Sequence, residues 1–209
     1  MARRDAICSL YERMGSLPPD EIVLCFDPKP GIQILGNPRY AHGRWDGPRG
    51  GRHRLIEFEY RRLGTRTLVA FVAPATGDCV YHDVYHKDRR YDSEATVELL
   101  ENARRYLLAA GFNRVHLVLD NGSTHTSRIT SKYFKEHEDF WVTYFTPVHA
   151  SWLNLCENFF STFSRRYLRH RRYAHVEEFR EKLPLWLDDH NGRCKPLRWT
   201  YAPHQRDAA

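Results

Sequence analysis

Short apolar runs separated by turn residues recur along the whole chain. Runs that are rich in β-branched and aromatic residues predict strands at 21–27, 67–73, 79–85, 115–119 and 140–145. Residues 32–35 either extend the first strand or pair back on it, and alternation at 54–60 predicts one more strand. The stretch 36–53, which contains Gly, Pro and basic residues, predicts a loop.

Apolar residues at helical spacing fill most of the remaining chain. They predict helices at 93–110, 126–137, 151–169 and 176–190, with Ser93 as a cap and Gly111 as a stop. Residues 1–20 are expected to be a short lead-in. This order predicts an α/β fold with a mixed sheet and helices on both faces. The strands at 21–27, 67–73 and 79–85 should form an antiparallel meander, which 115–119 and 140–145 join in parallel beside the first.

Composition narrows the class of protein. The 209 residues suit one globular domain, and 32 Lys and Arg against 26 Asp and Glu give a net charge of +6. This mild basic excess permits a nucleic-acid partner. The five cysteines are widely spaced, which argues against a disulfide framework and predicts a cytoplasmic protein. No signal peptide, membrane-length apolar run, P-loop or dinucleotide fingerprint is found, so neither a membrane nor a nucleotide cofactor is expected.

Three acidic residues lie at or in predicted secondary-structure elements. Asp27 and Asp120 each end a predicted strand, and Glu157 lies in a predicted helix with Asn154 three residues before it on the same face. Each also has a plainer interpretation: turn residues for the aspartates and a solvated helix face for Glu157. If the three carboxylates meet at one sheet edge they repel one another, and divalent cations relieve that repulsion. The combination therefore points to two-metal chemistry on phosphodiesters.

Two longer motifs carry a family resemblance. The segment LVLDNGSTH at 117–125 resembles the second catalytic block of bacterial insertion-sequence transposases related to mariner, and HASWLNLCENFF at 149–160 resembles their third block. The 36 residues between Asp120 and Glu157 give a spacing similar to that of the family. The run VLCFD at 23–27 resembles the first block, and the tail at 189–201 resembles the end of the same transposases.

The resemblance implies a ribonuclease-H-like fold and a catalytic triad. Asp27, Asp120 and Glu157 would hold two Mg²⁺ or Mn²⁺ ions, with Asn121, His125 and Asn154 in supporting positions. The implied activity is cleavage of DNA strands and their transfer to target DNA by in-line displacement at phosphorus. The implied partners are transposon ends and target DNA. Whether a homodimer forms stays open.

The chain departs from the family in two places. Pro28 stands where the family has Glu, and only about 20 residues precede the first strand, where the family carries a helix-turn-helix region. We therefore expect a catalytic domain at 21–205 without its end-recognition module. One alternative is a catalytically inactive DNA-binding remnant of a transposase. Another is a ribonuclease-H-like nuclease that acts on RNA.

Basic residues suggest where DNA would lie. Arg165, Arg166, Arg169 and Arg172 cluster at the end of the helix that contains Glu157 and are candidates for phosphate contacts, although a solvated face would look the same. Arg44 and Arg52 lie with an aromatic residue in the predicted loop, which suits DNA contact or a plain surface loop. The run HDVYH at 82–86 looks like a zinc-protease motif, but its strand pattern argues against metal binding.

Overall fold

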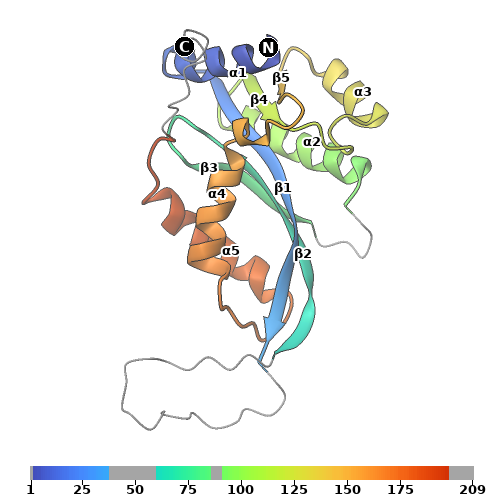
Figure 1. Cartoon of the computed structure of the whole chain (residues 1–209), viewed down its shortest axis with the longest axis vertical. Helices are drawn as coiled ribbons and strands as arrows, with labels where there is room; N and C mark the ends of the chain where they lie inside the picture. Colours follow the sequence, from blue (N-terminus) through green and yellow to red (C-terminus); the bar gives the residue numbers. More distant parts are fainter. Residues whose placement is uncertain (1, 38–59, 86–90, 198–209) are drawn as a thin grey trace, which may run out of the picture.

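A five-stranded mixed sheet organises the molecule (Figure 1). The computed structural model describes residues 2–37, 60–85 and 91–197. The strands lie in the order β3-β2-β1-β4-β5. Their bounds are β1 Glu21–Gly36, β2 Arg61–Val72, β3 Cys79–Tyr85, β4 Arg114–Leu119 and β5 Trp141–Phe145. β1, β2 and β3 pair antiparallel, whereas β4 joins β1 in parallel and β5 joins β4 in parallel. The predicted meander and its two parallel strands are confirmed.

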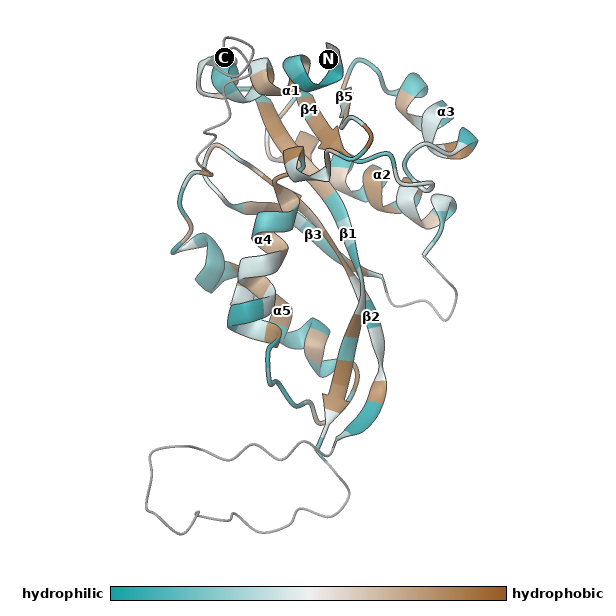
Figure 2. Ribbon diagram, viewed as in Figure 1, coloured by the Kyte–Doolittle hydropathy of each residue, from teal (hydrophilic) through white to brown (hydrophobic). Residues whose placement is uncertain are grey.

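Alternation along β1 divides the interior into two cores. Val23 and Cys25 belong to one core and Leu24 and Phe26 to the other, since successive side chains of a strand point to opposite faces. Figure 2 shows the hydrophobic colour running along the strands and the hydrophilic colour on the outer sides of the helices. The strands are therefore buried on both sides, as their apolar runs predicted.

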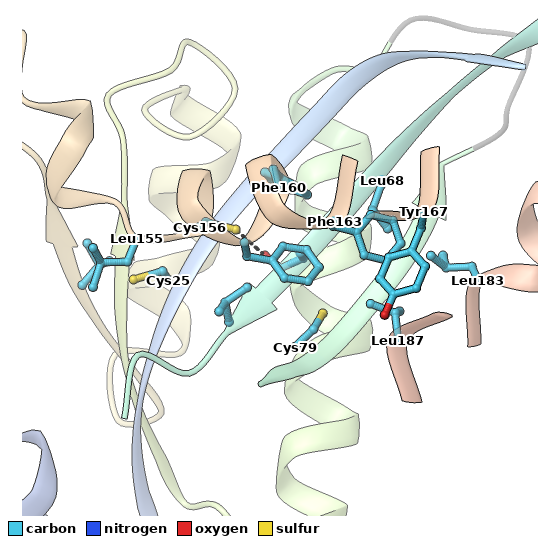
Figure 3. Close-up of a cluster of buried hydrophobic side chains, with 14 of the residues drawn as sticks. Cys25, Leu68, Cys79, Leu155, Cys156, Phe160, Phe163, Tyr167, Leu183 and Leu187 are labelled. Carbon is cyan, nitrogen blue, oxygen red and sulfur yellow. Dashed lines mark hydrogen bonds between the residues drawn. The ribbon is translucent and has the colours of Figure 1, made fainter. Parts of the chain in front are cut away.

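Helices cover each face of the sheet. The face of Cys25 carries α1 (Ala2–Arg13), α4 (Cys156–Phe163) and α5 (Glu178–Asn191), and the opposite face carries α2 (Ser93–Ala109) and α3 (Arg128–Glu136). Phe163 and Tyr167 pack between β2 and α5 in a cluster that also holds the buried cysteines Cys25, Cys79 and Cys156 (Figure 3). No helix among the described residues is long and apolar enough to cross a membrane.

β1 changes the face of its apolar residues partway along. Lys29 pairs with Leu68 and Ile32 pairs with Arg66, so β1 uses one residue more than β2 between these pairs. This is a β-bulge, and Gly31 has the positive φ of 69° that Gly adopts without strain. As a result Ile32 and Ile34 face the same core as Cys25 despite their opposite parity.

Several local predictions differ from the structure. Residues 1–20 were expected to be a lead-in, yet α1 and the 3₁₀ turn Met14–Ser16 lie there, and Ile7 and Leu10 are fully buried. The cap of α2 is Asp92, whose side chain accepts from the Ala95 N–H at 2.9 Å, and not Ser93. Residues 32–35 extend β1. The predicted strand at 54–60 lies outside the described residues except for Tyr60, which is not in a strand.

The predicted helix at 151–169 is not continuous. It consists of a 3₁₀ turn at Ser151–Leu153, then α4, then a π-helical turn at Ser164–Leu168. Asn154, between the first two parts, has the extended backbone angles φ −85° and ψ 97°. The apolar spacing alone did not reveal this break, because each piece has helical periodicity.

Candidate active site

The parallel register of β1 and β4 brings two aspartates together. Cys25 pairs with Val118 in this register, and Asp27 and Asp120 each follow two residues later. Cys25 and Val118 face the same core. Because the side-chain period of a strand is two, Asp27 and Asp120 continue on that face. Asp120 directly follows the carboxyl end of β4, the edge where open α/β folds collect catalytic groups. Asp27 was predicted to end its strand, which is wrong: it lies inside β1, just beyond the part that pairs with β4.

Helix α4 brings the third acidic residue to the same place. Asn154 Nδ2 donates to the Phe26 carbonyl oxygen at 3.0 Å, and its Oδ1 accepts from the Cys156 N–H at 3.2 Å. Cys156 Sγ lies 3.6 Å from the carbonyl oxygen of Ala70, which is the register partner of Asp27. These contacts fix the first turn of α4 against β1 and β2. Glu157, in that turn, is exposed.

The electrostatics of Asp27 record this convergence. Burial, first, and then the negative charges of Asp120 and Glu157 raise the pKa of Asp27 to about 7, while His125 and Lys29 oppose the rise. Opposition by like charges means that Asp120 and Glu157 both lie near enough to act on Asp27. Ionisation of Asp27 is unfavourable beside these negative charges, and bound cations would make it favourable.

Asp120 is held by its neighbours in the chain. Its Oδ1 accepts from His125 Nδ1 at 2.7 Å and from the Gly122 N–H at 2.9 Å. The hydrogen bond from His125 is the main reason that the pKa of Asp120 is lowered. Since a carboxylate only accepts, Nδ1 of His125 carries the proton in this contact. Asp120 therefore stays ionised beside Asp27.

His125 is built into the interior. Its side chain is 2% exposed, and its ring packs 5.1 Å from the ring of Phe26. Its Nε2 is buried and has no hydrogen-bond partner. His125 therefore makes a structural hydrogen bond, whose acceptor is Asp120.

The donor set suits hard divalent cations. Asp27, Asp120 and Glu157 offer only carboxylate oxygens, which such ions prefer. Oδ2 of Asp120 is not used by His125 or Gly122. Among the described residues, however, no three His, Cys, Asp or Glu side chains are already gathered in a metal-binding group. The residues fit divalent ions by chemistry and by their mutual repulsion.

Two of the expected supporting residues have other contacts. Asn154 was expected to share a helical face with Glu157, which is wrong: Asn154 is 1% exposed and both of its amide atoms bond to backbone. Asn121 donates to the carbonyl oxygen of Thr146 and accepts from Arg3 Nη1 at 3.3 Å. Both amides therefore shape the edge of the site by holding loops and helices.

Lys29 is a residue near the site that the motifs missed. It lies two residues after Asp27 on β1, and its Nζ lies 5.7 Å from the centre of the Phe160 ring on α4. Its charge acts on Asp27 and lowers the pKa of that carboxyl. The signal was present in the sequence, since residues two apart on a strand share a face.

The arginine candidates are only partly described. Helix α4 and the π-helical turn after it span residues 156–168. Arg165, Arg166 and Arg169 are exposed at the end of this segment. Arg172 lies over the ring of Tyr60 at 5.7 Å. Arg44 and Arg52 fall outside the described residues. His82 lies in the strand β3 as predicted, which is unlike the helix that a zinc-protease motif needs, and residue 86 is not described.

A comparison with protein-family models gives one match. A family model described as DDE superfamily endonuclease matches residues 37–180. This span contains Asp120 and Glu157 and begins after Asp27. A comparison with curated proteins found no match.

Solved structures of the Mos1 transposase share the fold. The crystal structure of the catalytic domain of Mos1 mariner transposase has a TM-score of 0.61 at 14% identity, covering 89% of this chain and 79% of its own. The Mos1 mariner paired end complex with Mn has a TM-score of 0.63 at 18% identity, covering 90% and 54%. The Mos1 paired-end complex with left transposon end has 0.60 at 16%, covering 93% of this chain, which spans 55% of that longer chain. The expected ribonuclease-H-like fold is confirmed.

Proposed function

The chain belongs to the DDE superfamily endonuclease family, and from this premise we propose that it is the catalytic domain of a transposase. It would cut DNA strands and join their 3′-hydroxyl ends to target DNA. One observation supports the proposal most: the charges of Asp120, just after β4, and of Glu157, on α4, both act on the carboxyl group of Asp27 on β1. A fold like that of the Mos1 catalytic domain supports it.

Each acidic residue has a distinct part in the proposal. Asp27, Asp120 and Glu157 would hold two Mg²⁺ or Mn²⁺ ions, which would activate the attacking oxygen and stabilise the leaving oxygen of an in-line displacement. Solved structures of the Mos1 catalytic domain with Mn and with Mg support this choice of ions. His125 orients Asp120 through its Nδ1 hydrogen bond. Asn154 holds the helix that carries Glu157.

The proposed partner is DNA. Arg165, Arg166 and Arg169 are exposed and would contact phosphates beyond Glu157. The Mos1 complex with a left transposon end supports transposon ends as the substrate. An origin in a bacterial insertion sequence, and with it a place at the bacterial nucleoid, rests on the motif resemblance. Assembly as a homodimer is part of the same proposal and is measured by light scattering with and without DNA.

The test is metal-dependent nicking of supercoiled plasmid. Wild-type protein with Mn²⁺ or Mg²⁺ should nick the plasmid with little sequence preference, and EDTA should stop the reaction. Asp120→Asn should abolish nicking because it removes a charge that would bind metal while it keeps the shape of the side chain. The matched control is Glu138→Gln, an exposed carboxylate that follows α3, and it should nick as wild type does.

Three results would contradict the proposal. Equal nicking by wild type and Asp120→Asn would show that a contaminating nuclease is responsible. Salt-sensitive DNA binding without metal-dependent nicking would favour the inactive remnant. Cleavage confined to the RNA strand of a hybrid would favour the third alternative, a nuclease that acts on RNA.

A further inference from the structure

A small cavity lies between α4, α5 and the turn that joins β2 to β3. It has a volume of about 230 Å³, which is below the roughly 300–1,000 Å³ of pockets for drug-sized ligands. Its polar lining comes from α4 and from the segment after α5 that the motif comparison assigned no role. The side chains that give it this character are Asn158, Thr162, Arg166, Arg193 and Lys195.

The segment that follows α5 is attached firmly to the β2–β3 turn. Asn191 pairs with the backbone of Cys79 in both directions, accepting from its N–H at 3.0 Å and donating to its carbonyl at 3.1 Å. Cys194 Sγ donates to Asp78 at 2.8 Å, and the Leu197 N–H donates to the Pro74 carbonyl at 2.9 Å. The cavity wall is therefore preorganised by side-chain and backbone contacts.

Gly77 makes the closest approach in this wall. A Cβ atom at this position would lie 2.3 Å from the backbone oxygen of Lys195, and Gly77 has a positive φ of 86°. Only Gly fits both the turn and this contact. The turn thus fixes the backbone of Lys195, one of the residues that line the cavity.

Three of the residues that line the cavity are cationic, and they lie beside apolar ones such as Val72, Phe159 and Leu197. Arg166, Arg193 and Lys195 contribute three cations, and none of the described residues that line the cavity is acidic. Arg193 Nη2 bonds to Asp189 at 2.7 Å, which leaves other donors of its guanidinium for a ligand. Asp189 also accepts from the hydroxyl of Tyr167 at 2.5 Å. The three positive charges suit a singly charged phosphate group better than a cation.

Helix α4 leads from the proposed active site to the cavity. Asn158, which follows Glu157, and Thr162 are four residues apart and share a side of α4, and Arg166 lies in the π-helical turn that follows it. Arg166 is nine positions after Glu157, which corresponds to at most about 13 Å at the α-helical rise of about 1.5 Å per residue. A DNA strand advances about 3.4 Å per nucleotide, so this length spans about four nucleotides.

From these observations we infer that the cavity is a subsite for one backbone phosphate of DNA, held by Arg193 and Lys195 together with Arg166. The inference rests on the proposed function, because the DNA strand that it receives is the one that passes the carboxylates. It assigns a binding role to Arg193 and Lys195, whose segment resembles the end of the family's sequences but carries none of the three acidic residues.

Lysine footprinting tests occupancy directly. Wild-type protein is acetylated with an amine-reactive reagent in EDTA, alone, with a short DNA duplex, or with inorganic phosphate, and the labelled lysines are quantified by mass spectrometry. DNA should lower the labelling of Lys195 several-fold and leave Lys135, on α3, unchanged. A DNA subsite is supported if DNA protects Lys195 at a much lower concentration of phosphate groups than is needed for protection by inorganic phosphate. Protection by inorganic phosphate alone, or by neither, overturns it.

The salt dependence of DNA binding gives a second measurement. The double variant Arg193→Ala, Lys195→Ala should bind DNA about ten-fold more weakly, and the slope of log affinity against log salt should fall by about 0.9 if one phosphate contact is lost. Lys135→Ala, the matched control, should keep the wild-type slope. An unchanged slope in the double variant, with an unchanged melting temperature, overturns the inference.

A variant that keeps every charged side chain tests whether the position of Lys195 matters as well as its charge. Gly77→Ala should weaken DNA binding as the double variant does, because the new Cβ displaces the backbone of Lys195. If Gly77→Ala does not fold, the double variant and the footprint still decide. All binding is measured in EDTA, so failure of catalysis does not affect it: nicking by a protein whose Lys195 is unprotected would reject the subsite and keep the proposed function.

Discussion

The side-chain amide of Asn154 donates a hydrogen bond to the backbone carbonyl of Phe26 at 3.0 Å. The bond joins Asn154, two residues before the start of α4, to Phe26, the residue just before Asp27. The same side chain accepts from the N–H of Cys156. One buried amide therefore sets the position of Glu157 relative to Asp27, although it is 128 residues away from Phe26 in the sequence.

Replacing Asn154 should cost both stability and activity. Asn154→Ala leaves a buried carbonyl and a buried N–H without partners, and each such loss costs about 1–3 kcal/mol. We expect urea denaturation to show the free energy of unfolding reduced by about 2–4 kcal/mol, and nicking to fall even where the protein is fully folded. The control is Asn113→Ala, whose amide bonds to Asp20 at the surface and whose loss should change stability little. A stable but inactive Asn154→Ala would assign this residue to chemistry instead of position.

Removing the imidazole beside Asp120 should weaken metal use. His125→Phe keeps a ring against Phe26 but cannot donate to Asp120. Because hydrogen-bond partners of metal ligands orient them, the Mn²⁺ concentration needed for half-maximal nicking should rise about 10–100-fold. The Mn²⁺ titration of nicking measures this, and the melting temperature shows whether the core is intact. A Mn²⁺ requirement identical to that of wild type would show that His125 only fills space.

Glu101 should link stability to acid pH. Hydrogen bonds from Arg104, above all, and from Arg105 and Tyr133 lower the pKa of Glu101 to about 2, against burial, which raises it. A folded pKa below the unfolded value, near 4.5, means that this contribution is complete above the unfolded pKa and is lost as pH falls towards the folded one. Glu101→Gln should therefore flatten the fall in melting temperature over this interval. Glu138→Gln should not, and an equal effect of both variants would contradict the assignment.

The buried thiols should resist alkylation. Burial raises the pKa of Cys25 to about 11 and of Cys79 to about 12, and it also raises the pKa of Cys156 well above its usual value. Only the thiolate reacts, so iodoacetamide at about pH 8 should modify these three cysteines only when the protein unfolds. Burial and the hydrogen bond to Asp78 also raise the pKa of Cys194 to about 11. Mass spectrometry should therefore find Cys194 labelled slowly too, but before these three because it is only partly buried. Rapid labelling of native Cys156 would show that the first turn of α4 opens.

The order and pairing of the strands could be predicted because the apolar runs and the connections between them pointed to the same sheet. Apolar runs bounded by turns located β2, β3 and β4, and the presence or absence of a helix between strands gave parallel or antiparallel pairing. The length of β1 was harder, since Pro28 and Pro30 interrupt its pattern. They are tolerated because, beyond Cys25, β1 pairs only with β2 among the described residues.

Other features depend on contacts that a sequence pattern does not contain. α1 is polar overall, and among its apolar residues Ile7, Leu10 and Tyr11 mark its buried side. The break at Asn154 follows from a hydrogen bond to a distant strand, while its own segment fits a helix. The aspartates could be located because each ends an apolar run. The role of Lys29 required knowing that β1 continues past Asp27.

The bulge in β1 divides this strand into two parts that can evolve separately. Residues before Lys29 align Asp27 with β4, whereas residues after Gly31 pair only with β2 among the described strands. Deleting Gly31 would turn Ile32 and Ile34 towards the opposite side of the sheet, yet it would leave the registration of Asp27 with Ala70 unchanged. Insertions and deletions in the outer part of the hairpin can therefore accumulate without misaligning the carboxylates. The cost of such a change falls on the core instead, because Ile34 is fully buried and the Leu35 carbonyl accepts from the Tyr173 N–H at 2.8 Å.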